Sequence, residues 1–380
     1  MQEIREEGGI RMNLTAKRRL IVYSLSHLVI DFACYIILFG YFSGQAEAGK
    51  LAVGFLVYNT IAFPTQMLIG DWFDRRRRSE RLSALIGCGL AAAGLFAAAA
   101  EAEYAALILC AVGNAFFHVG GGMDSLIYSG GKYAGPGIFV AFGALGVSLG
   151  TKLGSSGMTV WPALAAVLIC GVLIALFGKG EEETPVPGRG TTVRSERAAD
   201  MAEWIVLLCV ISVMIRSFAG FLVKMPWVGE RLLWSFLPSF CAFVGKAFGG
   251  ILADRYGARR IAVLTLGASL PLLCFGYSVP PVCGIGIILF NMTMAITAGR
   301  IFQVLPERPG FAFGLTTLGL WIGYLPGKVW AVPEAAKSIL LPAAIVISAI
   351  CLYLAIPGRQ KKDGGGNVCG SIKRNGGGLE

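Results

Sequence analysis

Charged residues are scarce in this chain, and their scarcity excludes water as the solvent for most of it. Only 15% of the 380 residues are Asp, Glu, Lys or Arg, whereas 55% are hydrophobic. A soluble domain needs more polar residues than this to cover its surface. A bilayer core of about 30 Å needs roughly 20 apolar residues per helical crossing, so the length fits about twelve crossings and leaves no room for a sizeable soluble domain.

Several signatures of chemistry are also missing. The ten cysteines show no C-x-x-C spacing, and there is no H-E-x-x-H, no P-loop and no DNA-binding motif. Residues 146–150 match G-x-S-x-G, but they lie within an apolar run with no strand before them, which argues against a hydrolase. We therefore predict no enzyme, no ATP-driven pump, no cofactor and no metal. Nucleic acid is not predicted as a partner despite the net charge of +10.

Apolar segments of membrane-spanning length fall into two sets of six. They run approximately over residues 20–42, 51–70, 82–100, 104–128, 136–154 and 160–177, and over 204–223, 232–252, 261–277, 282–301, 311–326 and 339–356. The fold predicted is all-α and integral to the membrane, with two pseudo-symmetric six-helix bundles. The predicted division is a cytoplasmic segment (1–19), a first bundle (20–178), a cytoplasmic linker (179–201), a second bundle (202–356) and a disordered cytoplasmic tail (357–380).

Basic residues concentrate in alternate loops, which predicts the orientation. With the amino end in the cytoplasm, residues 17–19, 75–78 and 81, the linker, Arg308 and the tail share that side, and only scattered lysines and Arg231 face the other. Cytoplasmic loops carry the excess of Lys and Arg, so both termini are predicted to be cytoplasmic.

One loop pattern occurs twice, six helices apart. Its members are Gly70, Asp74, Arg75 and Arg78 after the second segment, and Gly250, Asp254, Arg255, Gly257 and Arg259 after the eighth. The glycine allows close helix packing, and the arginines can pair with the aspartate or with lipid phosphate. We expect Asp74 and Asp254 each to lie at the cytoplasmic face near the start or end of a helix from the other half, where an aspartate can meet the positive amino end of that helix. The alternative is that these are ordinary basic membrane anchors.

These residues resemble the loop motif of the major facilitator superfamily, G-x-x-x-D-R/K-x-G-R/K-R/K, although Arg77 replaces the glycine in the first copy. Further stretches are similar to the fosmidomycin-resistance group of drug exporters. These stretches are Ser26-His27-Leu28 with Asp31, Phe117-His118, residues 146–150, and Leu305-Pro306-x-Arg308-x-Gly310. The resemblance implies a monomeric transporter in a bacterial plasma membrane, with its first, fourth, seventh and tenth helices lining a cavity.

The fifth segment carries Gly137, Gly146, Gly150 and Gly154. This spacing resembles the signature of proton-coupled antiporters, except that Thr151 replaces a proline. Small residues every four positions allow backbone-to-backbone packing, on which two halves could rock. A packing face without any directional meaning remains the alternative.

Ionisable side chains inside apolar segments are costly and usually functional. His27 and Asp31 are four residues apart and share a helix face, and Asp31 and Arg216 both come out roughly 17 Å from the cytoplasmic side. We predict that His27, Asp31 and His118 respond to protons and that Arg216 is a substrate or charge partner of Asp31. Structural roles for His27 and Arg216 are the alternatives.

The remaining candidates for the substrate cavity are Asp124, Asn59, Asn291 and Trp321. Where the exporters have Pro-Glu after the histidine, this chain has Val119 and three glycines, 120–122, which are expected to loosen the fourth helix. The leading hypothesis is export of a small organic molecule in exchange for protons. Uptake or exchange of an organic anion and a non-transporting membrane sensor are the alternatives.

Overall fold

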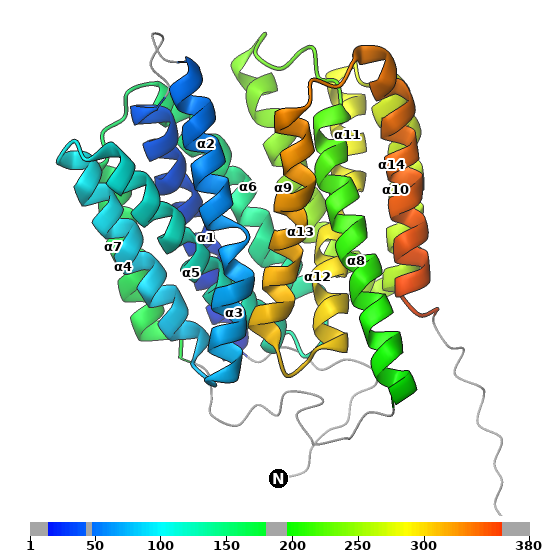
Figure 1. The fold of residues 1–380 in the computed structure, drawn as a ribbon, viewed down its shortest axis with the longest axis horizontal. Helices are drawn as coiled ribbons and strands as arrows, with labels where there is room; N and C mark the ends of the chain where they lie inside the picture. Colours follow the sequence, from blue (N-terminus) through cyan, green and yellow to red (C-terminus); the bar gives the residue numbers. More distant parts are fainter. Residues whose placement is uncertain (1–13, 43–47, 180–195, 359–380) are drawn as a thin grey trace, which may run out of the picture.

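The computed structural model describes residues 14–42, 48–179 and 196–358, and every regular element among them is a helix (Figure 1). In the first half these are α1 (Leu14–Tyr41), α2 (Ala48–Ala62), α3 (Thr65–Arg75), α4 (Glu80–Ala99), α5 (Glu103–Ile127), α6 (Ala134–Ser155) and α7 (Trp161–Phe177). The second half contains α8 (Glu196–Leu222), α9 (Leu232–Tyr256), α10 (Ala258–Phe275), α11 (Pro280–Asn291), α12 (Thr293–Val304), α13 (Pro309–Val329) and α14 (Glu334–Ala355).

All twelve predicted segments are helical, and two of them are each interrupted once. Ten spans in the described part are long and apolar enough to cross a membrane; two of these, Gly49–Arg75 and Pro280–Val304, contain the interruptions. The other two segments are α7, an apolar helix of 17 residues, and α13, in which glycine, threonine and aromatic residues lower the mean hydropathy. The chain is therefore a multi-pass membrane protein.

The interruption between α2 and α3 lies at Pro64, which has no N–H to continue the helix. Side chains after the break satisfy backbone carbonyls before it: Gln66 Nε2 donates to the Ala62 carbonyl at 2.7 Å, and Thr65 Oγ1 donates to that of Ile61. The interruption between α11 and α12 lies at Met292, near the middle of its span.

The two halves stand side by side, with α1 to α7 on one side and α8 to α14 on the other (Figure 1). Two helix pairs provide most of the contact between them: α6 packs on α9, and α3 packs on α13. Each half therefore contributes the helix that carries its loop motif and one partner helix. The linker residues 180–195 and the tail beyond residue 358 lie outside the described residues, whereas α1 and α8 begin about six residues earlier than predicted.

The three glycines of α5 do not loosen it, contrary to expectation, because the helix runs unbroken through them. At each of the three glycines, a different neighbour occupies the space that a side chain would need. A Cβ at Gly120 would collide with the α4 backbone, one at Gly121 with the Phe139 ring of α6, and one at Gly122 with the Phe313 ring of α13. This turn of α5 therefore packs against three other helices, one of which belongs to the other half.

The α6 glycines do pack backbone to backbone, but mostly within their own half. Gly146, Gly150 and Gly154 face the carbonyls of Leu28, Phe32 and Ile36 in α1, and α1 fills the groove that they leave. Only Gly137 meets the other half, where a Cβ would lie 2.7 Å from the Lys246 carbonyl of α9. Of the row on which the two halves were expected to rock, only Gly137 therefore lies at the contact between them.

Candidate functional site

The first copy of the loop motif closes one contact between the halves. Asp74, at the end of α3, accepts hydrogen bonds from the backbone N–H groups of Gly310 at 3.0 Å and Phe311 at 2.8 Å. Both donors lie in the first turn of α13, where N–H groups have no partner within the helix and the helix dipole favours negative charge. We call the face of the molecule that holds Asp74 the motif side.

The second copy makes the equivalent contact. Asp254, at the end of α9, accepts from the backbone N–H groups of Tyr133 at 2.8 Å and Ala134 at 2.9 Å, at the start of α6. Each half thus supplies a carboxylate to a helix start of the other half. The prediction that both aspartates meet a helix of the opposite half is confirmed.

The motif glycines make this approach possible. A Cβ at Gly70 would collide with the Gly310 backbone, and one at Gly250 with the Tyr133 carbonyl. Asp71, one position after Gly70, accepts from Arg308 and from Arg75, the latter at 2.7 Å. The first motif is therefore cross-linked to the other half by a second carboxylate that was not singled out from the sequence.

The remaining motif arginines have other partners. Arg259 lies over the Tyr353 ring, 3.5 Å from its centroid, and Arg255 lies over that of Tyr256 at 5.3 Å. Arg78 is exposed, and its backbone N–H closes the loop onto the Phe73 carbonyl at 3.0 Å. None of these three contacts involves a motif aspartate.

The departure of the first copy from the family pattern has a backbone consequence. Gly257 has φ of 97°, and Arg77, at the corresponding position of the first copy, has φ of 47°. Positive φ costs little for glycine but is unfavourable for a residue with a Cβ. Arg77 therefore retains the turn at a cost in conformational energy.

A cluster of ionisable groups lies in the first half, between α1 and α5. His27 Nε2 is 3.2 Å from Asp31 Oδ2, and His118 Nε2 is 3.7 Å from Asp31 Oδ1. Asn114 donates from Nδ2 to Asp31 Oδ1 at 2.8 Å. Gly143 of α6 closes over the pair, since a Cβ there would lie 2.5 Å from Asp31 Oδ2. The structure thus brings the three proposed proton-responsive residues together.

The hydrogen bonds of the other ring nitrogen, Nδ1, determine the tautomer of both histidines. Nδ1 of His27 lies 2.8 Å from the Phe139 carbonyl, and Nδ1 of His118 lies 2.9 Å from the Asn114 carbonyl. A carbonyl can only accept, so each Nδ1 carries a proton and donates. In neutral rings the Nε2 lone pairs would then face the Asp31 carboxylate. A proton between His27 Nε2 and Asp31 Oδ2 removes this repulsion, so the geometry favours a cluster that holds a proton.

The same three side chains offer ligand atoms that all lie within 4.8 Å of one another, a spacing that a metal ion can also use. Sequence reasoning missed Asn114, the fourth member of the cluster. The sequence could have indicated Asn114 by its spacing, because it precedes His118 by four residues and so shares a face of α5 with it.

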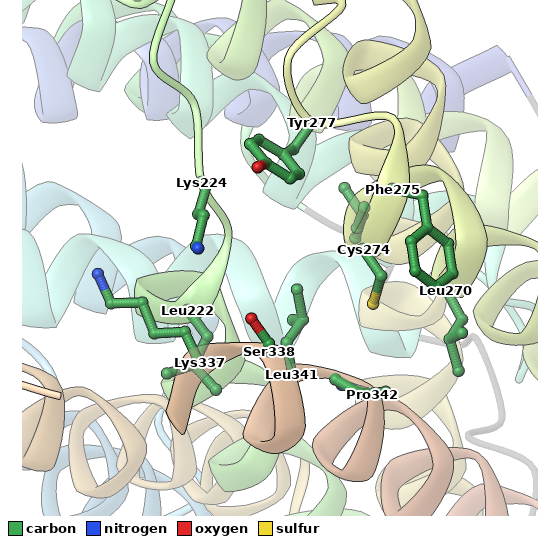
Figure 2. Close-up of a pocket in the computed structure, with 11 residues that line it drawn as sticks. Leu222, Lys224, Leu270, Cys274, Phe275, Tyr277, Lys337, Ser338, Leu341 and Pro342 are labelled. Carbon is green, nitrogen blue, oxygen red and sulfur yellow. The ribbon is translucent and has the colours of Figure 1, made fainter. Parts of the chain in front are cut away.

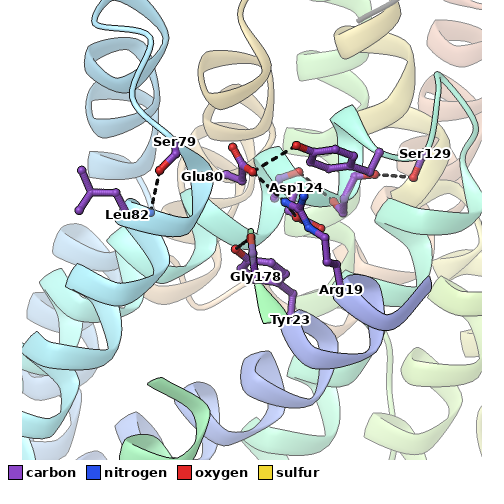
Figure 3. A network of polar contacts seen from close by, with 11 residues as sticks. Arg19, Tyr23, Ser79, Glu80, Leu82, Asp124, Ser129 and Gly178 are labelled. Atoms are coloured by element: carbon purple, nitrogen blue, oxygen red, sulfur yellow. Dashed lines mark hydrogen bonds and ion pairs between the residues drawn. The ribbon is translucent and has the colours of Figure 1, made fainter. Parts of the chain in front are cut away.

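Asp124 lies in a separate buried network and not beside Asp31 (Figure 3). It forms an ion pair with Arg19 of α1, which also pairs with Glu80 of α4 at 2.7 Å and stacks on the Tyr128 ring. Arg19 is 1% exposed and Asp124 is 2% exposed. The assignment of Asp124 to a substrate cavity is therefore replaced by an ion pair inside the first half. Arg19 was expected in a cytoplasmic segment, but it lies within α1 and is buried.

Arg216 does not pair with Asp31 in the structure. It is 4% exposed. Its Nε donates to the Ser212 carbonyl at 3.3 Å, its Nη2 to Thr297 Oγ1 at 2.7 Å and its Nη1 to Thr293 Oγ1. All of these partners belong to the second half. Asp31 and Arg216 were matched by their depth along the helix axis. Depth does not give the direction in which a side chain points.

The last three candidates lie close to the helix interruptions. Asn59 donates to Phe55 O at 2.7 Å and lies 3.5 Å from the Tyr324 hydroxyl, and Trp321 Nε1 lies 3.4 Å from Thr60 Oγ1, so both connect α2 with α13. Asn291 donates to the Ile287 carbonyl of its own helix at 2.9 Å. Two of the three therefore lie at the contact between the halves.

Two cavities lie away from the motif side. One of about 450 Å³ lies between α2 and α13 and includes Phe55, Tyr324 and Lys328 in its lining. The other, of about 410 Å³, lies at the end of the second half between α8, α10 and α14 (Figure 2). Its two lysines, Lys224 and Lys337, pair with Glu334 at 3.0 Å and 2.5 Å, so their charges are already shared with a carboxylate.

The arrangement of helices and motif contacts is that of the major facilitator fold. No family model and no curated protein matches the sequence. The human organic anion transporter MFSD10 is similar in structure, with a TM-score of 0.63 at 16% identity over 90% of this chain and 99% of that one. The Escherichia coli fucose:proton symporter FucP gives 0.61 at 14% identity over 88% and 96%. A bacterial homologue of the iron transporter ferroportin, in an outward-facing state, gives 0.59 at 13% identity over 90% and 99%.

Proposed function

We propose that this protein is a secondary transporter that exports a small organic molecule in exchange for protons by alternating access. The observation that carries the proposal is the geometry of the His27–Asp31 pair, which favours a proton between Nε2 and Oδ2. An imidazole group exchanges protons readily near physiological pH. A buried cluster that changes charge can bias two conformations of the protein.

The contacts on the motif side support alternating access. With the motif side in the cytoplasm, Asp74 and Asp254 hold the cytoplasmic ends of the halves together, and the conformation corresponds to one that opens outward. The similar ferroportin homologue is itself described in an outward-facing state. In the proposed cycle the cluster takes up a proton from outside, the motif contacts part, and the proton is released on the cytoplasmic side as substrate binds.

The resemblance to the fosmidomycin-resistance group supports export as the direction, and the basic loops support a bacterial plasma membrane with both termini in the cytoplasm. Uptake or exchange of an organic anion is the second candidate. The specific observation that favours it is Arg216, a buried cation whose hydrogen-bond partners are all uncharged.

The test is flux in everted membrane vesicles, with a panel of drugs that includes fosmidomycin, with and without an imposed proton gradient. We expect accumulation that collapses when a protonophore removes the gradient. Asp31→Asn keeps the size of the side chain but removes its charge, so it should abolish gradient-driven accumulation while leaving substrate binding intact. Asp200→Asn, at an exposed position near the start of α8, is the matched control. An Asp31→Asn protein that still concentrates substrate would refute the coupling role.

A further inference from the structure

Among its described residues, the second half of the molecule has two cations well inside its membrane helices and no carboxylate of its own at that depth. The cations are Arg216 of α8 and Lys246 of α9. The acidic residues in the described part of this half all lie in loops or near helix ends; they are Glu196, Asp200, Glu203, Glu230, Asp254, Glu307 and Glu334. Glu203 precedes Arg216 by 13 residues along α8, a separation of roughly 20 Å at the rise of an α-helix.

Arg216 has hydrogen-bond partners but no countercharge. Two threonine hydroxyls and one carbonyl receive its donors, and no carboxylate lies within ion-pair distance among the described residues. Each Nη group has two hydrogens, so the contacts to Thr293 and Thr297 leave donors for a ligand. A charge at membrane depth is costly unless something compensates for it. The side chain is thus arranged to meet an anion.

Lys246 lies close to the same place. The neighbouring Gly245 packs against Asn291, and Gly249 packs against Met292, so this stretch of α9 lies along the interruption between α11 and α12. Thr293, which follows that interruption, is a hydrogen-bond partner of Arg216. Lys246 itself has neither a hydrogen bond nor an ion pair among the described residues, and the carboxylate that acts on its charge is Asp31 of the first half. The helices that carry the two cations therefore both pack along one interruption of a membrane helix, and Lys246 lies between that interruption and the cluster of the first half.

The charge of the first half is of the opposite kind at comparable depth. Asp31 is the acidic member of its cluster, and it is satisfied by two histidines and Asn114. It does not neutralise Arg216, whose contacts are all within the second half. Its charge acts on Lys246 instead, so Arg216 is the cation that has no opposite charge near it.

We propose that Arg216 and Lys246 bind the substrate, and that the substrate is a small organic anion with a carboxylate or phosphate group. This assignment rests on the proposed transport function and narrows its substrate class. The planar guanidinium can hold two oxygens of such a group side by side, and the ammonium of Lys246 attracts it as a point charge. A neutral or cationic molecule would leave the charge of Arg216 uncompensated.

The binding test uses the full-length purified protein in detergent. Thermal unfolding is followed with succinate and glycerol 3-phosphate as anions and with glucose and choline as neutral and cationic controls, all at equal ionic strength. We expect at least one of the anions to raise the unfolding midpoint in a saturable way, because a ligand that binds only the folded state stabilises it. Glucose and choline should leave the midpoint unchanged.

Variants identify the site. Arg216→Lys keeps the charge but loses the planar pair of donors, and Arg216→Gln loses both; each should weaken anion binding roughly tenfold or more. Lys246→Gln should weaken it as well, and it keeps the test informative if the Arg216 variants fail to fold. Lys337→Gln removes a charge from the same half at the distant Glu334 pair and should bind like the wild type.

Protection by glucose or choline as strong as by the anions, no protection by either anion, or wild-type binding by both Arg216→Gln and Lys246→Gln would each overturn the inference. Failure of the transport function itself looks different. In that case anions would still bind and the variants would still lose binding, but reconstituted vesicles would show no flux with or without a proton gradient.

Discussion

The imidazole ring of His27 stands almost perpendicular to that of His118, with an interplanar angle of 85° and centroids 4.3 Å apart, and both rings present Nε2 to Asp31. Two positively charged rings at this distance would repel each other, whereas the carboxylate attracts a positive charge on either ring. Under the proposed function, the three groups are therefore expected to act as one site and not independently.

Removal of either motif carboxylate should loosen the motif side. In Asp74→Asn and Asp254→Asn an amide replaces the charge that faces a helix start, a loss of about 0.3 to 2 kcal/mol for each contact. We expect slower transport at unchanged membrane levels, and greater reactivity of a cysteine placed at position 311 or 134 towards a water-soluble maleimide. Unchanged labelling in both variants would mean that these carboxylates do not hold the halves together.

Arg77→Gly should stabilise the protein. The arginine has φ of 47°, and glycine adopts this conformation without the steric cost of a Cβ. We expect a gain of about 1 kcal/mol, measured as a higher unfolding midpoint in detergent. The matched control is Arg76→Gly, because Arg76 has φ of −91° and gains nothing from glycine. Equal effects of the two variants would rule out the backbone explanation.

The Arg19–Asp124 pair should behave as a buried ion pair. Arg19→Met leaves Asp124 charged, buried and without its strongest partner, at an expected cost of about 3 to 5 kcal/mol. Arg19→Met combined with Asp124→Leu removes both charges and should recover much of that loss. A double-mutant cycle on the unfolding midpoint measures the coupling. Additive effects would show that the two side chains do not depend on each other.

Gly122→Ala should destabilise the junction between the halves. The added Cβ meets the root of the Phe313 ring, which cannot move without shifting α13, so a cost of about 1 to 3 kcal/mol is expected. Gly89→Ala is the control, since a Cβ at Gly89 has no heavy atom within 4 Å and alanine favours a helix. It should be neutral or stabilising. A Gly122→Ala protein as stable as Gly89→Ala would contradict the packing.

The sequence predicted the elements better than it predicted their partners. Apolar length is a local property, so all twelve segments were found, and the repeated motif correctly placed Asp74 and Asp254 opposite a helix of the other half. Side-chain direction is not local. Arg216 and Asp31 were matched by depth alone, yet the guanidinium turns toward α12 because two threonine hydroxyls lie there.

The partner of Asp124 was also not predicted from the sequence. Its partner, Arg19, was counted as part of a basic segment outside the membrane, because three basic residues in a row are typical of a cytoplasmic flank. Because α1 begins at Leu14, Arg19 lies within the helix, and its guanidinium reaches Asp124 of α5. Asn114 could have been found by its spacing from His118, but an asparagine in an apolar run is a weak signal on its own.

The paired contacts of Asp74 and Asp254 have a consequence for how sharply the molecule can switch. The four backbone hydrogen bonds that they accept lie at two equivalent joints between the same two halves. If the halves rotate as units about an axis that passes through neither joint, both joints lengthen together, so partly open forms lose the bonds without gaining a new set. The intermediates are then sparsely populated, and the protein behaves as a cooperative two-state device although it has a single chain.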